Sequence, residues 1–330
     1  MEMGRDVMRA VQVVAPGRAE FVEAPAPAVQ PGHVLVRTSR VSLCGSDIWM
    51  LHYAPEAMYP FPPGTTGHEV VGYVAAVNGE GRGLKPGDPV LALVSGHVGM
   101  AEYCTLPAEH AVPLPPDKPL DHLLQAQQLG TVIYACKHLP GPVLGKTAVV
   151  IGQGSAGLWW DWMLRRLGAR RVIGMDLLPH RLMLPRHYGA THTVNNREVD
   201  PVAAVREITG GELADLVVSA AGEPEAILLA PHLVRQHGDI LYFGIPHSST
   251  LQMDYWSFFR KYPRMKMISG AMDEPGQASI WQALEFIAGG EIDVGPVITH
   301  RLPFDQVMDA YELQHTRDEG AVKIVVEFPE

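Results

Sequence analysis

A glycine-rich segment between two short apolar runs constrains the fold of this chain more than any other feature. Residues 147–152, TAVVIG, and 171–176, RVIGMD, have the length and the β-branched content of buried strands. Between them, GQGSAG at residues 152–157 opens a helix-length segment. This order predicts a strand, a tight turn, a helix and a second, parallel strand, which together form the βαβ unit of a doubly wound sheet.

Each glycine of this turn is explained by a separate steric requirement for the absence of a side chain. Gly152 permits the tight turn, Gly154 lets a phosphate approach the backbone, and Gly157 lets the helix pack on the strand. Asp176 ends the second run, where the motif places an acid on the ribose hydroxyls, and its charge would repel a 2′-phosphate. We therefore expect NAD rather than NADP. The predicted cofactor-binding residues are Gly152, Gly154, Ser155, Ala156, Gly157, Asp176 and Arg181.

Composition and charge indicate the class of protein and the partners. With 330 residues and 47% hydrophobic content, the chain is long enough for two domains with proper cores. The formal charge of 26 − 36 = −10 is dispersed, which argues against a nucleic-acid or anionic membrane surface. Neither a bilayer-spanning run nor the apolar core of a signal peptide is visible in the sequence. We expect a cytoplasmic protein with a small-molecule partner, and neither nucleic acid nor membrane as a partner.

The strand and helix patterns predict two kinds of domain, and the fold class is α/β. Short β-branched runs separated by turns predict a mostly antiparallel β domain at the start of the chain, with strands in residues 10–14, 33–41, 69–77, 89–94 and 101–107. Further along, strands alternate with helix-length segments, which predicts a parallel sheet with helices on both faces. The helix-length segments include residues 121–139, 180–189 and 224–238.

The first domain also contains a candidate metal set. Cys44 lies in VSLCGSD, and His68 and Glu69 lie in GHEVVG. A catalytic zinc ion takes three protein ligands of mixed sulfur, nitrogen and oxygen type and keeps one position open for a substrate oxygen. These three residues form a plausible set, although a lone cysteine is more often a small buried apolar residue. Cys104 is expected to be a buried strand residue, and His97 is expected to be a turn residue.

The motifs taken together resemble one family. The chain resembles the zinc-dependent medium-chain dehydrogenases, especially the sorbitol, threonine and polyol dehydrogenases. The motifs that carry the resemblance occur in the order found in that family: VxxCGSD, PxxxGHExxG, LKPGDPV, AEYCTLP, and VVIGQGSAG with VIGMD. The resemblance covers nearly the whole chain. It implies a GroES-like catalytic domain made of residues 1–128 and 271–330, with a Rossmann NAD-binding domain, residues 129–270, inserted between them.

The resemblance also implies roles for individual residues. Cys44 and His68 match the first two zinc ligands, and Glu69 matches an acid that acts as a ligand or orients one. Ser46 matches the hydroxyl that hydrogen-bonds the substrate oxygen, and Asp47 matches the acid that orients the histidine. Cys44, Ser46, His68 and Glu69 are therefore the candidate catalytic residues.

Three departures from the family pattern affect the site. The family's next zinc ligand falls on Gln128, a weaker and neutral donor, so either Gln128 or Glu69 completes the predicted metal set of Cys44, His68, Glu69 and Gln128. Trp49 replaces a histidine that relays protons, and an indole only donates, which leaves His52 or water for the task. The lobe that holds a structural zinc is absent, so one catalytic zinc per chain is expected.

The expected activity is hydride transfer between NAD and a secondary alcohol, such as a polyol, cyclitol or amino alcohol, in a cleft between the domains. A zinc-free quinone or enone reductase of the same superfamily is one alternative, and the retained Cys44 and GHE motif argue against it. A non-catalytic NAD-binding protein is the other, suggested by Gln128 and the missing histidine. A homodimer or homotetramer is expected from the family.

Overall fold

A computed structural model describes residues 7–271 and 274–329. The chain divides into two compact units. Residues Thr131–Ala271 form the second unit, and the described residues before and after this stretch form the first. The chain therefore enters the second unit once and returns to the first with its C-terminal part.

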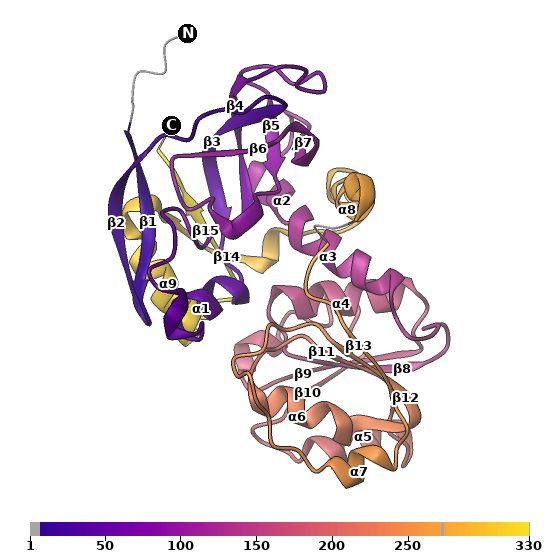
Figure 1. Ribbon diagram of the computed structural model, residues 1–330. Coiled ribbons are helices and arrows are strands. Elements are labelled where there is room, and N and C mark those ends of the chain that lie inside the picture. The colour runs from indigo at the N-terminus through magenta and orange to yellow at the C-terminus, as the bar shows by residue number, and fades with distance from the viewer. Residues whose placement is uncertain (1–6, 272–273, 330) are drawn as a thin grey trace. The chain divides into compact units, whose positions relative to one another are not determined.

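A mostly antiparallel sheet forms the centre of the first unit. Its strands are ordered β14-β15-β3-β4-β5-β7, with β6 also pairing with β3. Among the described strands of this sheet, only β14 and β15 pair in parallel. A hairpin of β1 and β2 lies beside it (Figure 1). The strands of this unit are β1 Val7–Ala15, β2 Arg18–Pro25, β3 His33–Ser42, β4 Glu69–Val77, β5 Pro89–Ala92, β6 Tyr103–Pro107, β7 Ala111–Pro113, β14 Ile298–Pro303 and β15 Lys323–Glu327.

The core of the first unit joins residues from both ends of the chain. Val36 of β3 and Val70 of β4 belong to the same buried cluster as Phe304, Tyr311 and Ile324. Because this apolar surface is shared, the C-terminal segments cannot leave the first unit without exposing it to water. The helices of this unit are α1 Gly45–His52, α2 Leu120–Leu124, α8 Ala278–Ala288 and α9 Val307–Thr316.

The second unit contains a parallel sheet ordered β10-β9-β8-β11-β12-β13. From β8, the next two strands, β9 and β10, are added on one side. The chain then returns to place β11 on the other side of β8, followed by β12 and β13, so the strand order reverses between β8 and β11. Ligands of doubly wound sheets bind at the carboxyl ends of the strands at this reversal. The strands are β8 Thr147–Ile151, β9 Arg171–Asp176, β10 His192–Asn195, β11 Ala214–Ser219, β12 Val234–Tyr242 and β13 Arg264–Met267.

Helices cover both faces of this parallel sheet. In Figure 1, α4 lies on one face, and α5 and α6 lie on the other. Both faces are apolar: Val149, Ile173 and Val217 are buried on one face, and their chain neighbours Val150, Val172 and Val218, which alternate to the other face, are buried as well. The helices are α3 Ala126–Lys137, which begins at the end of the first unit, α4 Ser155–Arg166, α5 Pro201–Thr209, α6 Pro224–Leu233 and α7 Tyr255–Phe259.

The predicted fold class is confirmed, but two predicted helices are wrong in extent. Residues 180–189 form only a short 3₁₀ turn at Pro179–Leu182 followed by turns, because Pro185 has no amide hydrogen with which to continue a helix. The helix predicted over residues 224–238 ends at Leu233. Val234 instead begins β12, where it pairs with Ala214 of β11. Pairing with a neighbouring strand overrides the local helical pattern there.

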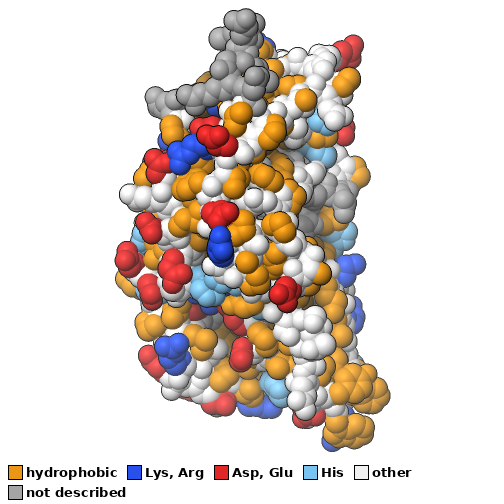
Figure 2. Space-filling model, turned by 60° about the vertical axis from the view of Figure 1, so that its left-hand side comes forward, with side chains coloured by type: hydrophobic (Ala, Val, Ile, Leu, Met, Phe, Trp, Pro, Cys, Tyr) orange, Lys and Arg blue, Asp and Glu red, His pale blue; other side chains and the backbone are white. Residues whose placement is uncertain are grey.

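The surface agrees with the dispersed charge of the sequence. On the face shown in Figure 2, lysine and arginine side chains are interspersed with acidic and apolar ones and form no continuous basic surface. None of the helices in the described part of the chain has both the length and the apolar character needed to cross a bilayer.

Candidate functional site

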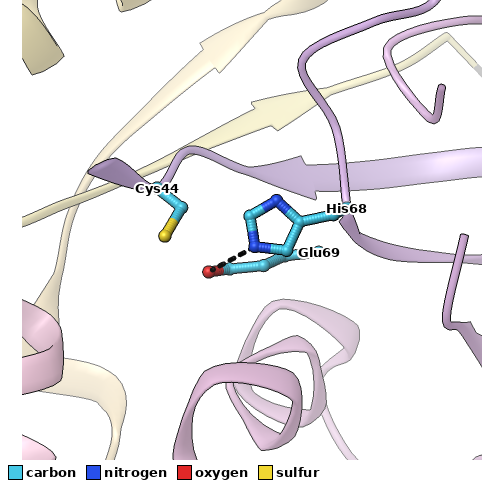
Figure 3. A group of neighbouring side chains, drawn as sticks. All are labelled: Cys44, His68 and Glu69. Atoms are coloured by element: carbon cyan, nitrogen blue, oxygen red, sulfur yellow. Dashed lines mark ion pairs between the residues drawn. The ribbon is translucent and has the colours of Figure 1, made fainter. Parts of the chain in front are cut away.

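Three side chains of metal-binding type come together in the first unit. Cys44 directly precedes α1, and His68 and Glu69 lie where β4 begins. The Cys44 sulfur, a His68 ring nitrogen and a Glu69 carboxylate oxygen lie within 4.8 Å of one another. The His68 Nε2 is 3.9 Å from the Glu69 Oε1, and in Figure 3 the cysteine and glutamate side chains lie on this side of the ring. Thiolate, imidazole and carboxylate are the donors that zinc takes in proteins.

The start of α1 fixes the opposite side of the His68 ring. The backbone N–H of Cys44 donates to Asp47 Oδ2 at 2.7 Å, so the first turn of the helix holds the aspartate. Asp47 is completely buried, and its Oδ1 lies 3.6 Å from His68 Nδ1. The Ser46 hydroxyl is 3.5 Å from the same ring nitrogen. Asp47 therefore orients His68 so that Nε2 faces the cysteine and the glutamate.

Asp47 and His68 stabilise each other's charged forms. Burial alone would raise the pKa of Asp47, but the hydrogen bond and the charge of His68 outweigh it and lower the pKa. Burial alone would lower the pKa of His68, yet Asp47 and the Cys44 sulfur raise it well above its usual value. Because a metal ion takes the place of a proton on a histidine ligand, metal binding here is coupled to proton release.

Glu69 is tied to a lysine that the sequence analysis missed. The Lys323 Nζ lies 2.6 Å from Glu69 Oε2, and both side chains are almost completely buried. This contact is an ion pair rather than an aligned hydrogen bond. The Ser42 hydroxyl also donates to Glu69 Oε2, so one carboxylate oxygen is occupied while Oε1 faces His68. Nothing in the strand pattern of residues 321–328 distinguishes this lysine as a partner of Glu69.

Gln128 and Trp49, at which the chain departs from the family pattern, and the candidate relay residue His52 lie in different surroundings. Gln128 lies on α3, and its Nε2 donates to the Cys44 sulfur at 3.6 Å, so the amide does reach the candidate metal group. Trp49 packs against the core of the first unit. His52 lies at the end of α1 opposite to Ser46 and stacks on His315 of α9, with ring centroids 4.0 Å apart. These contacts give His52 a packing role on α9.

His97 also lies at the site, although the sequence predicts only a turn residue. It does end a short 3₁₀ turn, Ser95–His97, but its ring centroid is 4.5 Å from that of His68. Nitrogens of His97 and His68 and an oxygen of Asp47 lie within 4.8 Å of one another. Burial and the charge of His68 lower the pKa of His97 to about 4, so its ring is neutral at pH 7. The flanking glycines are the only sequence signal that marks this position.

A buried acceptor without a donor indicates that a cation fits here. Among the described residues, Glu69 Oε1 has no hydrogen-bond partner. Lys323 and Ser42 occupy only Oε2 of this carboxylate, and a cation bound between Glu69 Oε1 and His68 Nε2 would give the second oxygen a partner. The residues present therefore fit zinc, which Cys44, His68 and Glu69 could bind directly, with Gln128 beside them.

The glycine turn of the second unit has the predicted geometry. Gly152 has φ +90°, and a Cβ there would lie 2.9 Å from the Cβ of Ala221, which follows β11. A Cβ on Gly157 would overlap the carbonyl oxygen of Gly152, so only glycine lets α4 pack onto the turn. Gly154 is the N-cap of α4, and Ser155 and Ala156 begin the helix. The turn lies at the carboxyl end of β8, where the strand order reverses.

Asp176 fastens this turn to the end of β9. Its two carboxylate oxygens accept the backbone N–H groups of Gln153 at 2.7 Å and Leu178 at 2.9 Å. Arg181 lies against Gly154, where a Cβ would be 3.6 Å from the guanidinium. The acid and the arginine predicted for the cofactor site therefore both lie at the glycine turn.

A buried acid in α4 is a second feature that the sequence analysis missed. Asp161 is completely buried, and burial raises its pKa well above the usual value despite the nearby amide of Gln153. The neighbouring Trp159 and Trp160 are also completely buried and pack edge-on against Tyr188 and Phe243. Asp161 therefore lies in an apolar environment that favours its protonated form.

Comparisons with known proteins place this geometry in context. The model of the alcohol dehydrogenase GroES-like domain matches residues 30–116, and that of the zinc-binding dehydrogenases matches residues 157–288. The chain is 25% identical to an alcohol dehydrogenase of Cupriavidus necator over 97% of this chain and 98% of that protein. It is 28% identical to an L-threonine 3-dehydrogenase of Symbiobacterium thermophilum, with the same coverage. The alcohol dehydrogenase TADH from Thermus sp. ATN1 superposes with a TM-score of 0.81 at 26% identity, over 98% of this chain and all of that one.

Proposed function

The chain belongs to the zinc-type medium-chain dehydrogenases of the polyol and threonine dehydrogenase group, and we propose that it oxidises a secondary alcohol with NAD and one catalytic zinc ion. The observation that carries this proposal is the group of Cys44, His68 and Glu69, whose donor atoms lie within 4.8 Å of one another. A polyol, a cyclitol and an amino alcohol are the candidate substrate classes. Residues 1–128 with 271–330 would form the catalytic domain, and residues 129–270 the cofactor domain.

Different residues of the first unit have different proposed roles in binding zinc. Zinc bound by Cys44, His68 and Glu69 would act as a Lewis acid that lowers the pKa of the substrate hydroxyl. Asp47 keeps the Nδ1 side of the His68 ring occupied, which leaves Nε2 for the metal. Gln128 donates to the Cys44 sulfur, and we assign it this supporting role rather than that of a ligand.

We assign the substrate proton to Ser46, whose hydroxyl lies at the N-terminal end of α1, two residues after Cys44, and can both accept and donate. Ser46 Oγ would accept the proton of the substrate hydroxyl while its own proton leaves, so that the serine stays neutral. Trp49 cannot continue that relay, because an indole has no acceptor, so the proton would pass from Ser46 to water.

Asp176 favours NAD over NADP. A carboxylate at the end of β9 repels a 2′-phosphate and accepts hydrogen bonds from ribose hydroxyls. The carboxylate is held by the backbone amides of Gln153 in the glycine turn and of Leu178 after β9, so its place does not depend on the cofactor. Arg181 at the same turn would favour a phosphate, and we assign it to the pyrophosphate region next to Gly154.

We also propose that the protein forms a homodimer through the outer edge of the parallel sheet. All four residues of β13 are exposed, and β13 lies at the edge of the described sheet. The adjacent α7 exposes Tyr255 by 62% and Trp256 by 66%. An exposed edge strand beside aromatic side chains can pair with the same strand of a second copy about a two-fold axis. Sedimentation analysis of the protein and of a Trp256→Asp variant tests this assignment.

The direct test of the proposed function combines metal analysis with turnover. Zinc per chain is measured in protein purified without added metal, and NADH formation is followed over a panel of polyols, cyclitols and amino alcohols. About one zinc per chain together with NAD-linked oxidation supports the proposal. Alcohol oxidation that persists at full rate in zinc-free protein would contradict it.

A further inference from the structure

His97 contacts the candidate metal centre but is not one of its proposed ligands, Cys44, His68 and Glu69. Its ring packs on that of His68 with an angle of 50° between the planes. A His97 nitrogen also lies within 4.8 Å of ligand-type atoms of both His68 and Asp47. The Nδ1 of His97 is buried and has no hydrogen-bond partner among the described residues. A second histidine therefore lies against the His68–Asp47 pair on which the orientation of the metal ligand depends.

The backbone at His97 is strained. His97 has φ +58° and follows Gly96, which has φ +73°. The left-handed conformation raises the conformational free energy of a residue with a Cβ by about 1–2 kcal/mol, whereas a glycine adopts it without this cost. Strain of this kind persists only where the surroundings determine the conformation, and it is concentrated at functional sites. A glycine at position 97 would relieve the strain but would remove the ring from His68.

The surroundings determine this conformation through glycine contacts. The N–H of Gly99 donates to the carbonyl of Gly67 at 2.9 Å, and that of Met100 donates to Gly64, also at 2.9 Å. A Cβ on Gly67 would lie 2.5 Å from the backbone nitrogen of Met100, so the two segments approach as closely as their backbones allow. The segment that carries His97 is thus fastened to the segment that carries His68, which fixes the spacing of the two rings.

We propose that His97 is a positioning residue of the metal centre. Its ring limits rotation of the His68 ring, so that Nδ1 stays on Asp47 and Nε2 stays on the side of Glu69. A ligand that is already oriented loses less freedom when the metal binds, and residues that orient ligands typically contribute 10–100-fold to metal affinity. This inference rests on the proposed zinc site and adds to it a residue outside the donor set.

The test measures metal binding rather than turnover. Zinc affinity is determined by competition with a chromophoric chelator for the wild type and for His97→Gly, His97→Asn and His97→Phe. Asparagine tolerates the left-handed conformation, so His97→Asn preserves the test if the glycine variant does not fold. His110→Gly is the matched control, since His110 also ends a 3₁₀ turn and also has a buried Nδ1 without a partner among the described residues.

The expected result is a 10–100-fold loss of zinc affinity in His97→Gly and His97→Asn, with His97→Phe retaining affinity within about threefold because the ring remains. The visible spectrum of the cobalt-substituted protein should change in the first two variants and not in His110→Gly. Unchanged zinc affinity in His97→Gly or His97→Asn overturns the inference, as does an equal loss in His97→Phe. Absence of zinc binding in the wild type would instead overturn the proposed function itself.

Discussion

The Lys323 Nζ lies 2.6 Å from Glu69 Oε2, so a cation from β15 neutralises the acid that follows His68. The two side chains are about 1% and 0% exposed, which places the pair out of reach of water. Removal of one partner from a buried ion pair leaves an uncompensated charge and is much more costly than removal of both. This asymmetry provides the first prediction.

We expect Lys323→Met to lower the free energy of unfolding by about 3–5 kcal/mol, because Glu69 is left buried with a charge that Ser42 alone cannot compensate. The double variant Lys323→Met with Glu69→Gln should recover a large part of this loss. Urea denaturation of the metal-free proteins measures both. A loss below about 1 kcal/mol in the single variant would show that the pair contributes little.

Cys44→Ser should abolish stable zinc binding and alcohol oxidation, because the donor set loses its thiolate. Affinity for NAD should remain, since the glycine turn lies in the other unit. Elemental analysis and NADH fluorescence titration measure the two properties. Cys104→Ser, in the buried strand β6, is the control and should keep its zinc.

Gln128→Ala separates a supporting role from a ligand role. We expect about tenfold weaker zinc binding, as for the loss of a group that orients a ligand, with zinc still bound at saturating concentration. Chelator competition measures the change. A loss of zinc as complete as that in Cys44→Ser would instead make Gln128 a ligand.

Asp176→Asn removes the charge at the end of β9 while keeping an oxygen that can accept the backbone N–H of Gln153. We expect the preference for NAD over NADP, measured as a ratio of kcat/KM values, to fall by at least about tenfold, which is about 1.4 kcal/mol. Thermal stability serves as the control for the turn. An unchanged ratio would assign cofactor selectivity to another residue.

The buried carboxyl group of Asp161 should make the stability of the folded protein depend on pH. Burial raises the pKa of Asp161, so the folded protein keeps a proton that the unfolded chain releases above about pH 4. This contribution to stability is complete below the unfolded pKa and decreases as pH rises toward the folded pKa, by about 1.4 kcal/mol per pH unit. Asp161→Asn, which cannot ionise, should match the wild type near pH 4 and exceed it increasingly toward pH 7.

Urea midpoints of Asp161→Asn and wild type between pH 4 and 8 measure this divergence. Asp318→Asn, at an exposed position, is the control and should run parallel to the wild type. Parallel curves for Asp161→Asn would mean that Asp161 is ionised in the folded protein.

The features that were predictable from sequence are those with local causes. The positive φ of Gly152 and the close approach of Gly157 to the Gly152 carbonyl arise within one turn and one helix, so the spacing of these glycines is visible in the chain. The end of α6 at Leu233 was mispredicted because the pattern continues past it, and pairing of Val234 with β11 decides the outcome.

The features that sequence analysis missed depend on distant parts of the chain. Lys323 reads as one polar residue in an apolar strand, and only the pairing of β15 with β3 brings it toward Glu69. His97 reads as a turn residue because its left-handed backbone follows from contacts between two loops, through Gly67 and Met100. Asp161 occupies a position at which the helix pattern does not reveal complete burial.

The partner of Glu69 also sets an order of events during biosynthesis. Glu69 leaves the ribosome with β4, but Lys323 follows about 250 residues later, which takes roughly 10–50 s at ordinary rates of translation. Until then, the acid beside His68 has no buried cation, and the sheet lacks the strand that brings one. The proposed metal centre would therefore be completed only after β15 has been synthesised, and a chain stalled before β15 would present Cys44 and His68 without Lys323 beside Glu69.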